Sequence, residues 1–279
     1  MDEDPLTRME NLLKSGVSTD KVLQDMINYL RQKESPPKSD TSLEEMIDDF
    51  LEAAGNKSEE HFETVEKIYD ELKEKSFDDI TKNYNYVTEF HRDALSGFGN
   101  FTINQIISDL EEDDKYKSVI LSYAINYSDL NEIVIDEDIS KLNYIGYRFG
   151  ENGMKKKLIV EGNAGDCCGN RMSDGTIYVK GNIGRFCGRE MSGGEIVISG
   201  DTRWLCGYMM SAGKIYVNGN VTDRCGEAMS GGEIYVSGHV TDRCGEDMYG
   251  GEITVDGEIV GPIGKNKTGG KIINKGNEY

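Results

Sequence analysis

The second half of the chain repeats itself every 19 residues, and this period limits the folds open to it. Aligned at that spacing, residues 158–276 place the same residue types in the same columns without an insertion. A cysteine, a glycine and a methionine recur in successive copies, as in Cys187, Gly188 and Met191. A repeat this short cannot bury an apolar face alone, so copies must stack on one another.

Each copy also carries a short strand pattern. Ile234 and Val236 alternate with Tyr235 and Ser237, and a period of two is typical of a strand with one buried face. Parallel strands stacked about 4.8 Å apart would satisfy the backbone and align identical side chains in ladders. Of the 33 glycines, 27 lie after residue 150, where tight corners and close backbone approach need them. We predict a right-handed parallel β-helix of about six to seven coils over residues 158–279.

The first half of the chain has a different character. It carries most of the formal net charge of −20, because residues 1–130 hold 30 acidic and 14 basic side chains. Its apolar residues fall at helical spacing, as in Val22, Met26 and Leu30. The fold class is therefore predicted to be mixed, with an all-α N-terminal domain before the β-helix. The expected divisions are a helical arm at 1–34, a linker at 35–42, an acidic helical domain at 43–130 and capping strands at 131–157.

Composition argues against several classes of partner. Phosphate recognition needs clustered Lys and Arg, so the acidic excess argues against nucleic acid, and it argues equally against an anionic membrane surface. No run of 18 apolar residues predicts a membrane span. The first residues are acidic and lack the apolar core of a signal peptide. We expect a cytoplasmic protein whose partners are other protein subunits.

The cysteines and methionines of the repeat form two regular columns. The members are Cys168, Cys187, Cys206, Cys225 and Cys244, and Met172, Met191, Met210, Met229 and Met248. A metal or iron–sulfur ladder is one interpretation, but ligand cysteines usually lie two to four residues apart. The hydrophobe Ile263 continues the cysteine column, and free cysteine is among the most buried residue types. We therefore predict two structural core ladders and no bound metal or cofactor.

Motifs for catalysis are missing from the sequence, so no catalytic residues are predicted. Ser192, Ser211 and Ser230 recur in the corners without a base near them in sequence, and His239 occupies a column otherwise held by Asn or Asp. Outward aromatic residues are a more promising feature. The candidates for a partner interface are Tyr178, Trp204, Tyr216 and Tyr235. The alternative is that they are ordinary aromatic residues on a β-surface.

The repeat resembles a known family. The pattern G-x-x-M-S-G-G-x-I-x-V-x-G at Gly226–Gly238 is similar to the GXGXG repeat family, which includes the C-terminal domain of the glutamate synthase large subunit. It also includes the β-helical subunit of formylmethanofuran dehydrogenase, to which Glu161–Asp166, followed by Gly169 and Met172, is especially similar. The similarity covers residues 143–276, and residues 1–130 match neither relative.

The resemblance implies a structural role. In both relatives the β-helix is a scaffold, and the chemistry belongs to other domains or subunits. The expected function is a non-catalytic scaffold or accessory subunit of a larger redox assembly, similar to the glutamate synthase domain. The alternative is the β-helical subunit of a true formylmethanofuran dehydrogenase, which binds tungsten or molybdenum catalytic subunits in methanogenesis. A free-standing hydrolase is a second alternative.

Overall fold

The computed structural model describes a continuous part of the chain and a few residues before it. The described residues are 115–128, 130–151, 153 and 155–279, with Glu63, Lys67, Ile68, Asp70, Ile103 and Ile107. The expected helical arm (1–34), the linker (35–42) and most of the acidic helical domain (43–130) lie outside these residues. The all-α N-terminal domain therefore stays a prediction.

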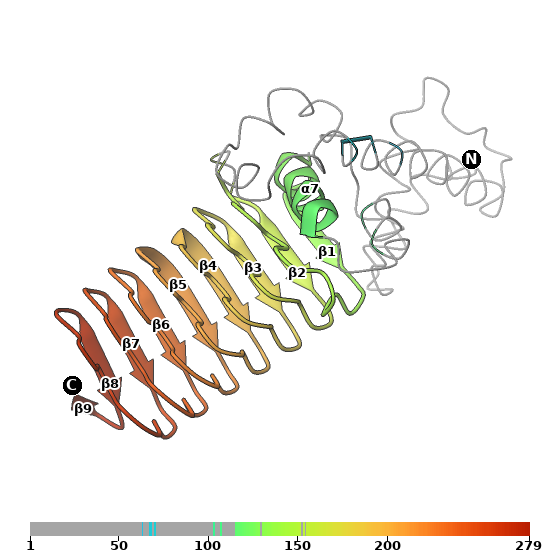
Figure 1. Cartoon of the computed structure of the whole chain (residues 1–279). Helices are drawn as coiled ribbons and strands as arrows, with labels where there is room; N and C mark the ends of the chain where they lie inside the picture. Colours follow the sequence, from blue (N-terminus) through green and yellow to red (C-terminus); the bar gives the residue numbers. More distant parts are fainter. Residues whose placement is uncertain are drawn as a thin grey trace, which may run out of the picture.

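Within the continuous part, one helix precedes a single sheet of nine strands (Figure 1). Helix α7 spans Lys115–Tyr127. The strands are β1 (Glu132–Ile135), β2 (Lys157–Val160), β3 (Thr176–Val179), β4 (Ser192–Ile198), β5 (Ala212–Val217), β6 (Glu233–Val236), β7 (Glu252–Val255), β8 (Lys271–Asn274) and β9 (Asn277–Glu278). Their order in the sheet is their order in the chain, and every neighbouring pair is parallel except β8 and β9. The chain winds as a stack of coils, which confirms the predicted parallel β-solenoid.

The stack advances by 19 residues for each coil from β2 to β8. Leu158 pairs with Ile177 and Ile177 pairs with Ile196, so equivalent residues of the repeat lie directly above one another. The same step recurs outside the strands, where the backbones of Cys225 and Cys244 form an isolated parallel β-bridge. The repeat in the sequence is thus the repeat of the structure.

Five inward ladders fill the inside of the coils. One coil contributes Ile177, Val179, Ile183, Cys187 and Met191, each at most 2% exposed. Each side chain packs on its counterparts in the coils before and after it, so the core is continuous along the stack. Burial of such a side chain contributes about 1.5–3 kcal/mol, which explains why these columns hold apolar residues in the middle coils, with Thr202 in the Ile183 column as the exception.

The corner before each methionine needs a backbone that most residues avoid. Gly188 has a φ of +63°, and a Cβ there would lie 2.6 Å from the Cδ1 of Ile215. Two non-glycine residues of the same corner, Phe186 and Glu190, also have positive φ values, of 60° and 55°. Left-handed conformations are unfavourable for such residues. The stacking of coils therefore maintains a path that the local sequence would not adopt alone.

A polar ladder runs along the turn that follows the strands. Its members are Asn163, Asn182, Asp201, Asn220 and His239. The side-chain oxygen of each of the first four accepts the backbone N–H of the next member, at 2.7–2.8 Å. His239 continues the pattern, since its Nδ1 accepts the N–H of Glu258 at 2.9 Å. The histidine therefore has a structural hydrogen bond in this turn.

The β-solenoid begins one coil earlier than the predicted start at residue 158. Residues 131–157, predicted to form capping strands, include β1, which pairs in parallel with β2. Ile145 and Phe149 lie in the positions of the cysteine and methionine ladders, because their carbonyls accept N–H groups from Gly169 and Ser173, both at 2.9 Å. The 19-residue alignment missed this coil because insertions separate Ile133 from its partner Leu158 by 25 residues.

Helix α7 lies at the β1 end of the stack, far from β8 and β9 (Figure 1). Ile120 and Tyr123 are at most 1% exposed and belong to the same core as the ladders. The side chain of Asn126 joins the helix to the first coil. It donates to the carbonyls of Tyr147 at 3.1 Å and Arg148 at 3.3 Å, and it accepts the N–H of Gly150 at 3.1 Å. The helix thus covers the apolar end of the solenoid.

The opposite end is closed by changes in the repeat itself. Lys267 takes the place of the methionine, and its ammonium group donates to the carbonyl of Gly270 at 2.8 Å. Asn274 takes the place of the valine, and its amide donates to the carbonyls of Val255 and Gly257, both at 2.8 Å. Because β9 then turns back antiparallel to β8, it covers part of the last strand edge.

Removal of the Asn126 side chain tests the role of α7 as a cap. Asn126→Ala leaves two buried backbone groups and the half-buried carbonyl of Arg148 without their partner, so we expect the free energy of unfolding to fall by about 3 kcal/mol. Urea denaturation followed by circular dichroism measures this change. Asn131→Ala, at an exposed position in the first coil, is the matched control. A difference between the two variants below about 0.5 kcal/mol would show that α7 is not anchored in this way.

Candidate interaction surface

The outer side of one corner gathers aromatic and basic side chains. Phe186 lies after β3, and Trp204 and Tyr208 lie after β4. The ring centroid of Phe186 is 5.4 Å from that of Trp204 and 6.2 Å from that of Tyr208. These distances are those of direct ring contacts. The three rings form one cluster although they come from two successive coils.

Two arginines cover this cluster. The guanidinium of Arg185 lies 5.4 Å from the centroid of Trp204, while that of Arg189 lies 5.6 Å from Phe186 and 5.8 Å from Tyr208. These distances are in the range of cation–π contacts. Arg185, Phe186, Arg189, Trp204 and Tyr208 are called the corner patch below. Trp204 is 37% exposed, so the patch presents a large aromatic surface to solvent.

The corner patch is not a requirement of the fold. In the later coils the same columns hold Asp223, Arg224, Asp242 and Arg243. Those side chains form ion pairs instead, including one of 3.2 Å between Arg243 and Asp223. Arg224 keeps the left-handed conformation of this corner with a φ of 53°, as Phe186 does with 60°, whereas Arg243 does not have a positive φ. The stack therefore continues with either kind of side chain. The aromatic cluster is therefore a local feature of two coils, which distinguishes it from the core ladders.

The other three candidate interface residues lie on a different surface. Tyr178, Tyr216 and Tyr235 point outward from β3, β5 and β6, where they are half-buried. Tyr216 and Tyr235 have centroids 6.5 Å apart, and the ammonium group of Lys157 lies 5.1 Å from the ring of Tyr178. Trp204 is in the corner and not on this sheet face. The structure thus divides the four predicted residues between two surfaces.

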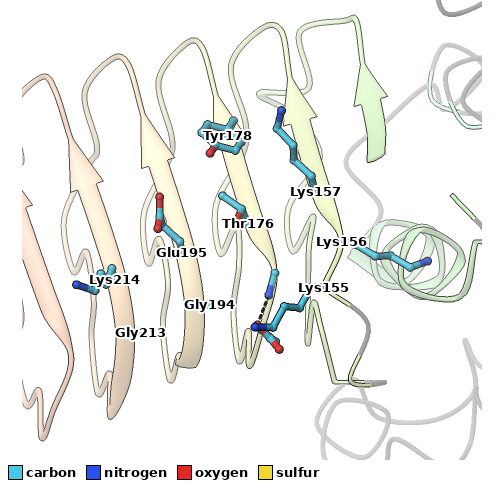
Figure 2. A pocket seen from close by; sticks show the side chains of 11 residues that line it. Lys155, Lys156, Lys157, Thr176, Tyr178, Gly194, Glu195, Gly213 and Lys214 are labelled. Atoms are coloured by element: carbon cyan, nitrogen blue, oxygen red, sulfur yellow. Dashed lines mark hydrogen bonds between the residues drawn. The ribbon is translucent and has the colours of Figure 1, made fainter. Parts of the chain in front are cut away.

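A shallow groove of about 460 Å³ runs along the edge of the sheet face, near the start of β2 to β5. Figure 2 shows its charged lining, which includes Lys155, Lys157, Glu195 and Lys214. Lys156 points away from the groove toward α7, where its ammonium group donates to the carbonyls of Ile125 and Ser128 (Figure 2). The groove is open and bears both signs of charge, so its lining suits a protein surface better than a small molecule.

The cysteine ladder lies inside the coils and does not face these surfaces. Burial raises the pKa of Cys168 to about 12 and that of Cys167 to about 11. A hydrogen bond with Cys206, together with burial, raises the pKa of Cys187 well above its ordinary value. Thiols with raised pKa values are poor nucleophiles and poor metal ligands. Among the described residues, His, Cys, Asp and Glu form no group of three that could hold a metal ion.

The corner serines and the repeat-half histidine have structural partners. Ser192, Ser211 and Ser230 each direct Oγ toward a methionine carbonyl of the preceding coil, at 3.4–3.5 Å. His239 belongs to the polar ladder of the turn. In the part of the chain that the structure describes, these residues are not brought together as a nucleophile and a base.

Comparison of the chain with protein-family models and with curated proteins finds no match to either. The helical segments that the structure describes include none with the length and apolar character needed to cross a membrane.

Alkaline pH tests the protonation of the cysteine ladder. An exposed thiol loses its proton near pH 9, whereas Cys168 keeps it until about pH 12. Between these two pH values the thiol is ionised in the unfolded protein and still protonated in the folded protein. The free energy of unfolding is therefore unaffected by this thiol below pH 9 and falls as the pH rises toward 12. We expect each such thiol to lower the free energy of unfolding by about 1.4 kcal/mol per pH unit in that window.

Cys168→Val should therefore weaken the pH dependence between pH 9 and 10.5, as measured by urea midpoints. At pH 7, Cys206→Val and Cys225→Val should each lower the free energy of unfolding by less than about 1.5 kcal/mol, because the volumes are similar. An alkaline slope that Cys168→Val leaves unchanged would mean that this thiol does not contribute to it.

Proposed function

We propose that this protein is a non-catalytic β-helix scaffold, an accessory subunit that docks on another protein of a larger assembly. The observation that carries the proposal is the corner patch, in which Trp204 remains 37% exposed while Arg185 contacts its ring. Trp, Tyr and Arg are the residue types that contribute most to binding energy at protein interfaces. The fold does not need them here, since later coils continue the stack with ion pairs in the same columns.

The chemistry of the corner patch indicates what its partner presents. Its rings offer an apolar centre, and the rim carries the guanidinium groups of Arg185 and Arg189. Both guanidinium groups are oriented by carboxylates of this chain, Arg185 by Asp166 at 2.6 Å and Arg189 by Glu190 at 3.0 Å. Because a guanidinium has five N–H donors, each keeps donors for a partner. An apolar side chain flanked by carboxylates would complement this arrangement, because arginine binds carboxylates in a fork geometry. We infer a partner with an acidic rim around an apolar contact.

The resemblance of the repeat supports a more specific proposal. A cytoplasmic redox assembly, similar to that of the glutamate synthase domain, is the first candidate, with the coils wound right-handed as in nearly all parallel crossovers. A formylmethanofuran dehydrogenase, with this chain as its β-helical subunit, is the second candidate, supported by the segment Glu161–Asp166. A free-standing hydrolase has less support, since the corner serines contact backbone carbonyls.

Recovery of the partner tests the corner patch. The tagged full chain would be purified from its native cells after brief cross-linking, and the bound proteins identified by mass spectrometry. We expect subunits of one oxidoreductase, recovered at least tenfold less with Trp204→Ala or Arg185→Glu, because each change removes one part of the cation–π pair.

Tyr249→Ala is the control, since it removes an aromatic side chain that is 61% exposed outside the patch. It should leave recovery unchanged. Equal recovery with all three variants would show that the partner binds elsewhere, and recovery of no oxidoreductase subunit would contradict the proposed redox assembly.

A further inference from the structure

The outward face of the sheet has a continuous stripe of mostly aliphatic and aromatic residues. Its residues are Val134, Ile159, Tyr178, Val197, Tyr216, Tyr235, Thr254 and Ile273, one from each of β1 to β8. All eight are half-buried, and we call them the central stripe. The strands lie side by side with little change of direction along the stack (Figure 1). A flat face of this kind can pack against another flat sheet about 10 Å away.

A column of charged residues borders the central stripe on the side where the strands begin. From β1 to β8 it reads Glu132, Lys157, Thr176, Glu195, Lys214, Glu233, Glu252 and Lys271. Residues at equal distances from the middle of this column carry opposite charges, except for the pair of Thr176 and Glu233. Reading from the two ends inward, Glu132 matches Lys271 and Lys157 matches Glu252 with opposite charge. At the centre Glu195 matches Lys214 in the same way.

We propose that the sheet face is the interface of a homodimer. Two copies lie face to face, and their solenoids run in opposite directions. The two-fold axis that relates them runs parallel to the strands and passes between β4 and β5. This axis places each strand opposite a strand of the second copy, β4 opposite β5 and β1 opposite β8. A two-fold interface must be complementary to itself, and the charge column meets this requirement.

The pairings across the axis have favourable charges. Lys157 faces Glu252 of the second copy, and Glu195 faces Lys214. Within each chain Lys157 already pairs with Glu132 at 3.1 Å and Lys214 with Glu233 at 2.8 Å, so the contacts across the axis extend these ion pairs into a network. The groove then receives acidic side chains, because its Lys155 and Lys157 lie opposite the half of the column that holds Glu233 and Glu252. In the central stripe Tyr178 meets Tyr235 of the second copy, and such aromatic pairs add to the binding energy.

The column on the other side of the stripe, two residues later in each coil, neither favours nor opposes the dimer strongly. Asp136 faces Lys275 of the second copy with opposite charge. One kind of like-charged pair remains, Glu161 opposite Asp256, and the two-fold axis makes it occur twice. Lys180 lies 2.6 Å from Glu161 within each chain and compensates its charge. Two compensated contacts at the rim have little effect on affinity.

The other face-to-face arrangement is unfavourable. If the two-fold axis ran along the solenoid, each coil would meet its own copy, and the two charge columns would face each other. Glu132 would then oppose Asp136, Glu252 would oppose Asp256, and Lys271 would oppose Lys275. Only Lys157 would meet an opposite charge, that of Glu161. Like charges directly opposite one another cost energy. The order of charges along the sheet therefore selects the antiparallel arrangement.

The size of the face predicts a dimer of modest affinity. Eight strands about 4.8 Å apart, each five residues wide at about 3.3 Å per residue, give roughly 550 Å² per copy. The total of about 1,100 Å² is near the lower limit for specific interfaces. We expect dissociation in the micromolar range. The corner patch stays free, because the chain turns away from the sheet between Val179 and Arg185.

Charge reversal tests the interface and its direction. Sedimentation velocity of the full chain from about 1 to 200 µM should show a monomer–dimer equilibrium. Lys157→Glu and Glu252→Lys should each weaken dimerisation at least tenfold, because each homodimer then holds two like-charged pairs. An equimolar mixture of the two variants should dimerise as the unchanged protein does, since every pair is again of opposite charge.

Glu258→Lys is the control, because it makes the same charge change at an exposed turn residue off the face. It should dimerise normally, and circular dichroism should show that all variants are folded. A chain that is monomeric at every concentration overturns the proposal. Dimers that both reversals leave intact, or a mixture that fails to associate, overturn it as well.

Discussion

Every level of this structure depends on the hydrogen bonds between one coil and the next. Each coil must follow the backbone path of its neighbour, residue by residue, for these bonds to form. Gly188 can adopt that path without strain, but Phe186 and Glu190 adopt left-handed conformations in the same corner. The bonds and the inward ladders therefore compensate for local strain. The sequence repeats at the inward positions because an inward side chain that fits one coil also fits the next.

The sequence alone predicted the ladders well because each residue type has a strong reason to repeat. Isoleucine, cysteine and methionine occupy inward positions that water cannot reach, and their 19-residue spacing is the spacing of the structure. The first coil escaped prediction for a physical reason. Insertions in its turns change the chain length between Ile133 and Leu158 without changing the stacking of the strands. Turn length is therefore weakly constrained, whereas strand register is strongly constrained.

The candidate surfaces were less accessible to sequence reasoning. Outward residues are not held to one chemical type, so alternation indicated that Tyr178 and Tyr216 point outward but not what surrounds them. Trp204 was singled out by type and lies on another side of the coil. Phe186, Tyr208 and the two arginines were missed, although their 19-residue offsets could have brought Arg185 and Trp204 together as neighbours in one column. Reading the variable columns as well as the invariant ones would have found the corner patch.

The closed ends have a consequence for how such a protein can change over time. Phe149 and Asn126 are needed at one end, and Lys267 and Asn274 at the other, while the coils between them are interchangeable. Gain or loss of one 19-residue unit by gene duplication or deletion would leave both caps intact and alter the length of the molecule by about 4.8 Å. It would also shift the order of charges along the sheet face, so mutations of this kind can preserve folding while they abolish recognition between copies.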